Sequence, residues 1–282
     1  MKPMLKYRGG KSQEIPEILP FVPSGYARYV EPFFGGGAMY FHLEPECALI
    51  NDLNRPLVDF YLGVRNDYPH LRKELDELEA EYAKNRSAFD ALKAQTPDER
   101  VPDDNEALYY RLRDMFNGKA EGYSPAAVYF FINKTAYSGM IRYNKQGDFN
   151  VPYGRYKHFN TKFVSEAHSQ LLQSTEIMCG DYEEVFKQCR VDDFVFLDPP
   201  YDCIFSDYGN EETRGGFNEY EHRRLAGAYY RLPSKALMVI GLTDLTYELY
   251  KGSIVHEYAK SYAVNIRNRF KSAGKHILVA NY

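Results

Sequence analysis

The sequence is poor in the residues that build disulfide frameworks and metal centres. Its 282 residues include only four cysteines, Cys47, Cys179, Cys189 and Cys203, and none of them belongs to a CxxC pair. The seven histidines show neither HxH nor HExxH spacing. Disulfide-rich secreted domains and zinc sites depend on such patterns. The sequence therefore argues against both classes, and we expect no metal ion and a reducing compartment.

Long hydrophobic segments are also missing. No apolar run approaches the roughly 20 residues that a membrane-spanning helix needs, and the opening MKPMLKYRGGK lacks the apolar core of a signal peptide. Hydrophobic residues nevertheless make up 44% of the chain and charged residues 26%, an ordinary globular composition. We expect a cytoplasmic protein with a substantial buried core and no membrane contact.

The net charge of −4 conceals a strong asymmetry along the chain. Residues 71–106 contain 11 acidic and 6 basic side chains, whereas residues 133–162 contain 6 basic and one acidic. Residues 260–275 contain 5 basic side chains and no acidic one. A polyanion responds to the local field rather than to the net charge. The basic segments are therefore compatible with a nucleic-acid partner, although solvated basic faces are the alternative.

Short apolar runs, turns and helical stretches predict the fold class. Residues 26–33 and 47–52 are typical of strands, and a helical stretch from residue 38 to about 43 separates them. Strand-like runs return after about residue 175, spaced among helical segments. This alternation predicts an α/β fold with a mostly parallel sheet and helices on both faces. The later runs lie at residues 174–182, 192–200, 234–241 and 275–282.

The middle of the chain has a different pattern. Leucine and aromatic residues recur at three- and four-residue spacings within residues 71–94, which predicts a helix, and residues 106–117 predict another. We therefore predict one catalytic domain made of residues 1–60 and 160–282, interrupted by an inserted, mostly helical domain of residues 61–159.

The run FVFLDPPY at residues 194–201 ends a predicted strand with an acid, two prolines and a tyrosine. Proline fixes its own φ and keeps the preceding residue extended, so Asp198 lies at the carboxyl end of the strand, where open α/β sheets bind ligands. The carboxylate of Asp198, the carbonyl groups of Pro199 and Pro200, and the ring of Tyr201 suit a planar heterocycle with an amino group. A rigid turn with an ordinary surface acid is the alternative.

Three glycines follow the first predicted strand, in EPFFGGG at residues 31–37. Glycine at such a turn lets the backbone approach a ligand closely. Asp52 ends the next strand, 15 residues beyond Gly37, where an acid accepts hydrogen bonds from ribose hydroxyls. The spacing differs from GxGxxG, which favours an adenosine-type cofactor over a dinucleotide. A tight turn without a ligand is the alternative.

Taken together, these motifs resemble the Dam-like adenine-specific DNA methyltransferases of the D12 class. LKYRGGK (5–11), EPFFGGG and DPPY occur in the order of the family's alpha group, and residues 133–156 resemble its DNA-contacting hairpin. The resemblance implies the Rossmann-like sheet of an S-adenosylmethionine-dependent methyltransferase. It also implies an inserted target-recognition domain with a β-hairpin at residues 135–156. It also implies methyl transfer to the exocyclic N6 amine of a flipped adenine in duplex DNA.

The resemblance implies roles for individual residues. Asp198 and a carbonyl of Pro199 or Pro200 accept hydrogen bonds from the target amine, and Tyr201 stacks on the flipped base. Asp52 binds the ribose hydroxyls, and Asp181 recognises the adenine edge of the cofactor. The implied cofactor-binding residues are Tyr7, Lys11, Phe33, Gly35, Gly37, Asp52, Asp181 and Asp198.

The chemistry requires a delocalised, weakly nucleophilic amine to be positioned toward a methyl group. Hydrogen bonds from both N–H groups favour a pyramidal nitrogen, so we expect catalysis by positioning and electrostatics without a covalent intermediate. The target base must leave the helix to reach the crevice. Cytosine C5 methylation instead needs a cysteine nucleophile, usually after proline, and the chain contains no Pro-Cys dipeptide.

The hairpin block combines basic and aromatic side chains around a turn at Gly147. Basic residues hold phosphates, and an arginine can read guanine in the major groove. Where the family commonly has Asn-Gly-Leu, this chain has Ser138-Gly139-Met140, so no target sequence is predicted. A charged surface hairpin without DNA is the alternative. The predicted DNA-binding residues are Tyr137, Ser138, Arg142, Asn144, Arg155 and Lys157.

Three other functions remain open. The same core serves RNA adenine methyltransferases and enzymes that methylate protein glutamine, although the basic hairpin disfavours a protein substrate. A catalytically silent DNA-binding regulator is the third, and the presence of Lys11, Asp52 and DPPY argues against it. The oligomeric state is left open, with a monomer compatible.

Overall fold

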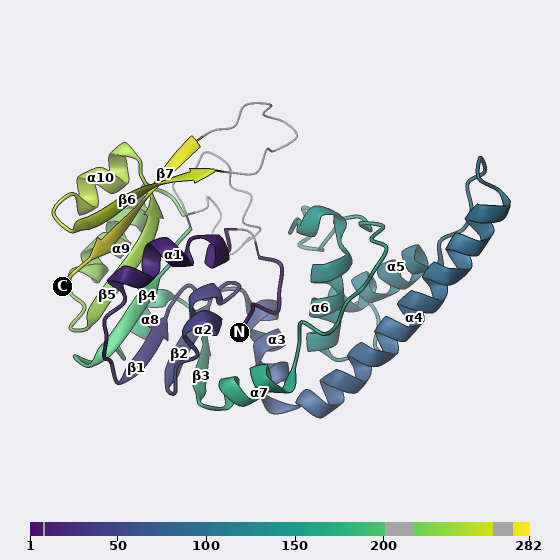
Figure 1. Ribbon diagram of the computed structural model, residues 1–282, viewed down its shortest axis with the longest axis horizontal. Coiled ribbons are helices and arrows are strands. Elements are labelled where there is room, and N and C mark those ends of the chain that lie inside the picture. Colours follow the sequence, from purple (N-terminus) through teal and green to yellow (C-terminus); the bar gives the residue numbers. More distant parts are fainter. Residues whose placement is uncertain (8, 201–216, 262–272) are drawn as a thin grey trace. The chain divides into compact units, whose positions relative to one another are not determined.

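The computed structural model describes residues 1–7, 9–200, 217–261 and 273–282 (Figure 1). The chain divides into two compact units, which we call the helical unit and the sheet unit. The helical unit comprises Met1–Gly10, Gly36–His42 and Asn54–Ser174, and the sheet unit comprises Lys11–Gly35, Leu43–Leu53 and Thr175–Tyr282. The sequence prediction placed residues 1–60 and 160–282 in one domain, whereas the compact units assign residues 1–10, 36–42, 54–60 and 160–174 to the helical unit.

The sheet unit is built on seven strands in the order β3-β2-β1-β4-β5-β7-β6. The strands β1 to β5 pair in parallel, and β7 runs antiparallel to both of its neighbours. In the centre, Val30 of β1 is in register with Leu49 of β2 and Val195 of β4. The strands are β1 (Arg28–Glu31), β2 (Ala48–Asp52), β3 (Thr175–Cys179), β4 (Asp193–Leu197), β5 (Lys235–Gly241), β6 (Ile254–Ser261) and β7 (Ala273–Ala280).

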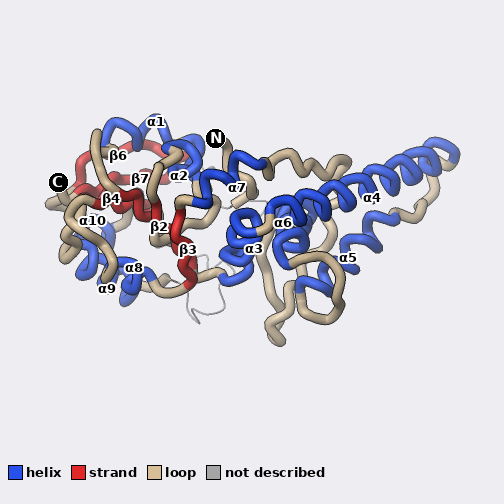
Figure 2. Tube along the Cα trace, turned by 90° about the horizontal axis from the view of Figure 1, so that it is seen from below, coloured by secondary structure: helices blue, strands red, loops and turns tan. Residues whose placement is uncertain are grey.

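Helices cover both faces of this sheet. The apolar sides of α8, α9 and α10 share one buried cluster with side chains of β1, β4, β5 and β7. The short helix α1 lies on the opposite face (Figure 2), where Ile18 is fully buried. The helices are η1 (Lys11–Gln13), α1 (Ile15–Ile18), η2 (Leu19–Phe21), α8 (Tyr182–Phe186), α9 (Glu219–Tyr229) and α10 (Asp244–Tyr250).

The strand β4 carries the candidate catalytic motif and lies at the centre of the sheet. All five of its residues are buried, because its neighbours pair with it on both edges and helices cover its faces. A continuous apolar run is typical of such a strand, and its prediction from FVFL is confirmed. The strand β6 was not predicted. It lies at the edge of the sheet, and its sequence IVHEYAKS mixes apolar and charged residues.

The helical unit has its core around α6, which packs against α3, α4 and α5. Nine of its eleven residues are buried, and Phe130 and Phe131 are fully enclosed. Sequence analysis missed α6, whose apolar run lacks a helical period, although Ser124 as N-cap and Pro125 at the first turn mark its start. The helices are α2 (Ala38–Leu43), α3 (Arg55–Asn66), α4 (Tyr68–Gln95), α5 (Asp104–Phe116), α6 (Pro125–Thr135), η3 (Tyr137–Gly139) and α7 (Glu166–Gln173).

The predicted helices of the middle block are present with shifted ends. The helix expected at residues 71–94 begins at Tyr68, where the side chain of Asp67 accepts a hydrogen bond from the amide of His70. The fold class is confirmed as a Rossmann-like α/β sheet accompanied by a mostly helical region. In the described part of the chain, no helix is both long enough and apolar enough to cross a membrane.

Candidate active site and nucleic-acid interface

Three acidic side chains gather at the carboxyl-terminal edge of the parallel strands. Glu31 ends β1, Asp52 ends β2, and Asp198 follows directly after β4. Because β1 lies between β2 and β4 and pairs in parallel with both, these ends meet at one edge. Glu31 is 2% exposed and Asp52 is 9% exposed. The edge therefore concentrates negative charge where it is poorly solvated.

Lys11 provides the positive charge that faces this edge. Its Nζ lies 2.7 Å from Oδ2 and 2.6 Å from Oδ1 of Asp198. The side chain of Lys11 is 3% exposed and that of Asp198 is 22% exposed. A buried ammonium that contacts both carboxylate oxygens orients the carboxylate and stabilises its ionised form. The predicted site residues Lys11 and Asp198 thus form one ion pair.

Burial and neighbouring charges set the protonation of this edge. Burial raises the pKa of Asp198 above its ordinary value, and the ammonium of Lys11 opposes that rise. Burial also raises the pKa of Glu31 well above its ordinary value, although the Tyr29 hydroxyl donates a hydrogen bond to it at 2.8 Å. The carboxylates of Asp198 and Asp52 raise it further. Such shifts at strand ends are typical of functional sites.

Hydrogen bonds fix the loops that follow β1 and β3. The amide of Gly35 donates to Oδ2 of Asp52 at 2.8 Å, and Gly35 has a φ of 49°, which favours glycine. The side-chain amide of Asn51 donates to the carbonyl of Pro32 at 3.0 Å and to that of Gly180 at 2.9 Å. One buried side chain of β2 therefore ties together the two loops on either side of it.

Asp181 is held by two donors at the start of α8. Its Oδ1 accepts the amide of Glu183 at 2.8 Å and Nη2 of Arg224 at 2.5 Å. The guanidinium of Arg224 also lies 4.8 Å from the ring centre of Tyr182. Phe33 packs against the same ring, with 5.2 Å between the two centres. An arginine, a carboxylate and two aromatic rings thus border the edge beyond β3.

The structure brings six of the predicted cofactor residues into the sheet unit, and it describes Pro199 and Pro200 immediately after Asp198, Pro199 being buried. Tyr201 lies outside the described residues. The six residues are Lys11, Phe33, Gly35, Asp52, Asp181 and Asp198.

Tyr7 and Gly37 belong to the helical unit. There, a Cβ atom added to Gly36 would lie 2.9 Å from Cβ of Tyr7, a spacing that real Cβ atoms avoid. Gly37 has a φ of 65°, so a side chain at that position would strain the backbone. Close packing at Tyr7 thus explains one glycine of EPFFGGG, and backbone conformation explains another.

The predicted hairpin has antiparallel pairing but no extended strands. Two isolated bridges join Ala136 to Tyr153 and Tyr143 to Phe149. Asn144 builds the turn between them, because its Oδ1 accepts the amides of Gln146 and Asp148 at 2.9 Å each. The short helix η3 interrupts the first arm, so the segment is a looped hairpin rather than a ribbon.

Tyrosine hydroxyls and one asparagine fasten this hairpin to the helices of its own unit. The hydroxyl of Tyr109 donates to the carbonyl of Val151 at 2.8 Å, and those of Tyr82 and Tyr153 lie 2.6 Å apart. The side chain of Asn117 accepts from the amide of Phe149 and donates to its carbonyl, at 2.8 and 3.1 Å. This fastening gives a structural role to several of the chain's 26 tyrosines.

The basic side chains of the hairpin are exposed and only loosely engaged. Nε of Arg142 donates to Oδ1 of Asn150 at 2.7 Å, which stretches the guanidinium along the hairpin. Arg155 contacts both carboxylate oxygens of Glu106 at 3.1 Å. Lys157 is exposed, and Tyr137 is 45% exposed. The arrangement presents positive charge and an aromatic ring to solvent.

Comparison with known proteins now identifies the family. Residues 7–264 match the family of D12 class N6 adenine-specific DNA methyltransferases. The chain belongs to this family. It is therefore an enzyme that methylates the N6 amine of adenine in DNA.

Three relatives illustrate the match. The chain is 34% identical over 290 residues to the type II methyltransferase M.CviBI of Paramecium bursaria Chlorella virus NC1A, with 100% of each chain covered. It is 32% identical over 308 residues to the type II methyltransferase M.MjaIII of Methanocaldococcus jannaschii, with 100% of this chain and 99% of the relative covered. It is 26% identical over 262 residues to the DNA adenine methylase of Haemophilus influenzae, with 89% and 84% covered.

Sequence reasoning did not single out three residues of this adenine methyltransferase that shape the site. Glu31 stands in EPFFGGG, and its place near the end of the strand predicted at residues 26–33 was the available signal. Asn51 precedes Asp52, but nothing in the sequence indicates that its amide joins two loops. Glu14 lies one turn beyond Lys11 and bonds to residues about 250 positions away, so no local pattern could reveal it.

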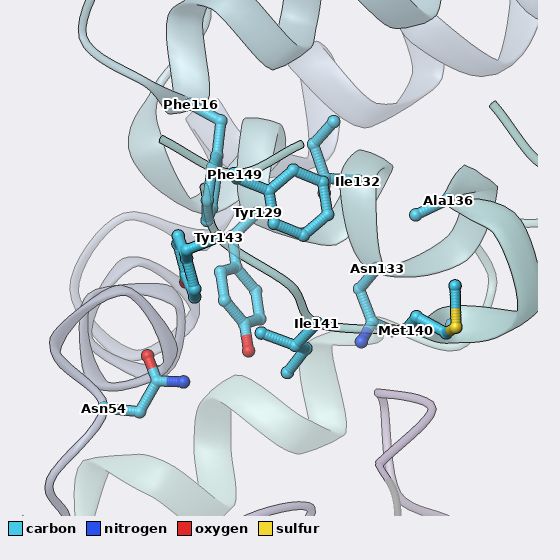
Figure 3. Close-up of a pocket in the computed structure, with 11 residues that line it drawn as sticks. Asn54, Phe116, Tyr129, Ile132, Asn133, Ala136, Met140, Ile141, Tyr143 and Phe149 are labelled. Carbon is cyan, nitrogen blue, oxygen red and sulfur yellow. The ribbon is translucent and has the colours of Figure 1, made fainter. Parts of the chain in front are cut away.

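A mostly apolar pocket lies between α6 and the hairpin of the helical unit (Figure 3). The rings of Phe116, Tyr129, Tyr143 and Phe149 line it together with Met140. Apolar side chains of the hairpin and of α6 thus line the same pocket. Elsewhere, among the residues that the structure describes, no group of three or more His, Cys, Asp or Glu side chains is arranged to hold a metal ion.

Proposed function

We propose that the protein transfers the methyl group of S-adenosylmethionine to the N6 amine of an adenine extruded from duplex DNA. The observation that carries this proposal is the placement of Asp198 at the carboxyl end of β4, held by a buried lysine and followed by two prolines. Membership of the family gives adenine in DNA as the substrate. The methyl donor, the extrusion of the base and the roles of single residues are our proposals, and the geometry of the site supports them.

The charge of the sheet edge fits the proposed cofactor. S-Adenosylmethionine carries a sulfonium and an ammonium group, and when bound it supplies an electrophilic methyl group. Glu31, Asp52 and Asp198 lie at this edge, and Lys11 forms an ion pair with Asp198. Burial is the main cause of the raised pKa of Glu31, and a bound cation would oppose the part that comes from the carboxylates of Asp198 and Asp52.

Three side chains would hold the nucleoside part of the cofactor. Asp52 would accept hydrogen bonds from the ribose hydroxyls while it keeps the Gly35 amide in place. The described bonds of Asp181 fall on its Oδ1, and we assign its Oδ2 to the exocyclic amine of the cofactor's adenine. Phe33, packed against Tyr182, would offer an apolar face beside them.

The target amine would donate its two N–H groups to Asp198 and to a carbonyl of the two prolines. Both acceptors are fixed, the first by Lys11 and the second by proline geometry, so the nitrogen lone pair is directed without further reorganisation. The proton that the nitrogen must lose after methylation would pass to the carboxylate of Asp198, which already accepts that N–H, and from there to solvent. The carboxylate has to be ionised at the start, a state that Lys11 stabilises.

The hairpin would bind the DNA. Arg142 would contact a base edge and Tyr137 would fill space near the extruded adenine, because both side chains are exposed on the same looped hairpin. Arg155, Lys157, Ser138 and Asn144 would contact the backbone, with Asn144 acting mainly through the turn that it builds. We place this activity in the cytoplasm, in keeping with the reducing compartment expected from the cysteine pattern.

Methyl transfer from isotopically labelled S-adenosylmethionine tests the proposal. The protein is incubated with duplex DNA, the same strand alone or the matching RNA, and the product is digested to nucleosides. We expect the label in N6-methyl-2′-deoxyadenosine from the duplex, and less label when unlabelled S-adenosylmethionine is added in excess. Label in 5-methylcytosine, or in RNA only, would overturn the proposal.

A further inference from the structure

Glu14 is a buried carboxylate with donors from two strands. The residue is 4% exposed, and its Oε1 accepts Nζ of Lys260 at 2.6 Å. Its Oε2 accepts the hydroxyl of Tyr258 at 2.8 Å and contacts Nδ1 of His276 at 2.5 Å. Tyr258 and Lys260 lie on one side of β6, and Tyr258 is in register with His276 of β7. We call these three donors the Glu14 cradle.

The same residue is rigidly connected to the lysine that holds Asp198. The amide of Glu14 donates to the carbonyl of Lys11 at 2.7 Å, so the two residues close one tight turn. Lys11 lies at the start of that turn, and its ammonium contacts both oxygens of Asp198. A displacement of Glu14 would therefore be passed to Lys11 through a single turn of backbone.

The buried apolar side chains of the following helix and the bonds of the cradle together hold this turn on the sheet. The helix that follows has only four residues, Ile15–Ile18, and helices of this length are not stable by themselves. The carboxylate of Glu14 points to the strands rather than capping this helix. A second contact, from Glu17 to Nε2 of His256 at 3.0 Å, joins the helix to the same strand. Side-chain bonds to β6 and β7 thus place the Lys11 turn on the sheet.

The charge of Glu14 is maintained despite its burial. Burial alone would raise its pKa, but the hydrogen bonds from His276, Lys260 and Tyr258, together with the charge of Lys11, hold its pKa at about 2. The carboxylate is ionised at neutral pH and contributes to the field in which Lys11 and Asp198 sit. Loss of this charge would weaken the bonds of all three donors, of which His276 is buried, and a buried donor without its acceptor is costly.

We propose that Glu14 is a positioning residue for methyl transfer, which orients the Lys11 turn through the Glu14 cradle and thereby fixes the carboxylate of Asp198. This inference rests on the proposed role of Asp198 as acceptor of the target amine. It also assigns a function to the β6–β7 pair, which would support the catalytic carboxylate from the strands at the antiparallel end of the sheet.

A matched control for this inference exists within the sheet unit. Asp193 is 3% exposed and pairs with Nη2 of Arg28 at 2.7 Å, so it is as buried and as firmly bound as Glu14. It begins β4, however, whereas Asp198 follows the end of that strand. Asp193→Asn breaks a buried ion pair at the opposite end of β4 from Asp198. Glu14→Gln instead disturbs the turn that carries Lys11.

The experiment compares Glu14→Gln and Asp193→Asn in the full-length protein, below the melting temperature of each. We expect Glu14→Gln to lower kcat about tenfold with KM values for DNA and S-adenosylmethionine within about twofold. Asp193→Asn should lower the melting temperature to a similar degree and leave kcat unchanged. Equal kcat in Glu14→Gln and the wild type, or equal losses of kcat in both variants, would overturn the inference.

A second variant keeps the test decisive if Glu14→Gln does not fold. Tyr258→Phe removes one donor and leaves the carboxylate with Lys260 and His276, and we expect kcat to fall about two- to threefold. An unchanged kcat in this variant would refute the positioning role. If Asp198→Ala retained normal turnover, the proposed function itself would fail, whereas an inactive Asp198→Ala beside a fully active Glu14→Gln would reject only the present inference.

Discussion

The charged side chains around Asp198 in the sheet unit are enclosed, whereas the arginines of the hairpin in the helical unit are exposed. Lys11 is 2% exposed and bonds to both oxygens of Asp198, and Glu14 has three donors in a buried cradle. Arg142 and Arg155 are exposed, and they bond to their own hairpin or to a surface glutamate. Enclosed charges keep one geometry because the alternatives are poorly solvated, whereas exposed pairs contribute only about 0–1 kcal/mol and exchange partners readily.

This difference matches two tasks. A methyl transfer needs acceptors that are already in place, so the charges near Asp198 are fixed before any substrate arrives. A DNA interface needs cations that can give up one partner for a phosphate, and the ion pair of Arg155 with Glu106 can be given up at little cost. Substitutions in the two units should therefore differ in the size and in the kind of their effects.

The largest effect is expected for Asp198→Ala. Because the carboxylate acts on the amine mainly in the transition state, kcat should fall ~100-fold or more while DNA binding persists. Single-turnover methylation and a DNA-binding titration measure the two quantities. Asp244→Ala removes an exposed carboxylate of α10 and serves as the control. Near-normal turnover in Asp198→Ala would contradict the role of the DPPY motif.

Lys11→Met is expected to reduce activity and to change its dependence on pH. Asp198 must be ionised, burial already raises its pKa, and Lys11 opposes that rise. Without the ammonium the pKa rises further, so activity should be lost at a higher pH as the solution is acidified, with a fall of roughly 10- to 100-fold at neutral pH. A pH–rate profile measures the shift, with Lys187→Met as an exposed control. If the acidic limb of the pH–rate profile did not move, the Lys11–Asp198 ion pair would not control the pKa of Asp198.

Asp52→Asn should weaken cofactor binding and leave the fold intact. Asparagine keeps one oxygen for the amide of Gly35 but replaces the other acceptor with a donor, which mismatches a ribose hydroxyl. We expect a loss on the order of 1–3 kcal/mol in affinity for S-adenosylmethionine by calorimetry. Asp192→Asn, at an exposed position before β4, is the control. Equal affinities in the two variants would remove Asp52 from the ribose site.

In the helical unit, Arg142→Ala should change specificity rather than rate. If the guanidinium contacts a base edge, its loss relaxes discrimination at one base pair by about 1–3 kcal/mol. Sequencing that maps methylated motifs in cells expressing the variant reveals the relaxed position. Lys145→Ala, an exposed lysine in the turn of the same hairpin, is the control. A motif unaltered in sequence and strength would leave the hairpin as a general clamp.

The smallest effect is expected for Lys157→Ala. An exposed lysine that contacts a phosphate adds affinity for every sequence equally, so its loss should weaken binding a few-fold and reduce the salt slope by about 1. Affinity measured for two unrelated duplexes at several salt concentrations gives both quantities. A loss confined to one of the duplexes would indicate that Lys157 contacts bases. Lys157 and Arg142 would then not differ in the kind of contact that they make.

The parts of the molecule that sequence predicted best are those with local signals. FVFLDPPY predicted a buried strand that ends in Asp198, because a central parallel strand is apolar on both faces and proline cannot continue it. The helix at residues 71–94 followed from its period, and its true start depended on the cap at Asp67. These features depend on neighbours in the chain, which a sequence displays directly.

The parts that sequence did not predict depend on distant partners. The helix α6 is buried on nearly every side, so its apolar residues show no amphipathic period. The strand β6 mixes polar and apolar residues, because His256, Tyr258 and Lys260 bond to acids near the start of the chain. The roles of Glu14 and Asn51 likewise arise from contacts across the fold. No spacing along the chain encodes such pairings.

The side-chain amide of Asn51 has a consequence for exchanging parts between related enzymes. It joins the carbonyl of Pro32, in the glycine-rich loop, to that of Gly180, before Asp181. In a chimera that takes only one of these loops from a relative, the carbonyl of the new loop is positioned for the hydrogen bond of another enzyme. The new loop then has to shift to bond to Asn51. The two loops and β2 should therefore be exchanged together when segments are swapped between related enzymes.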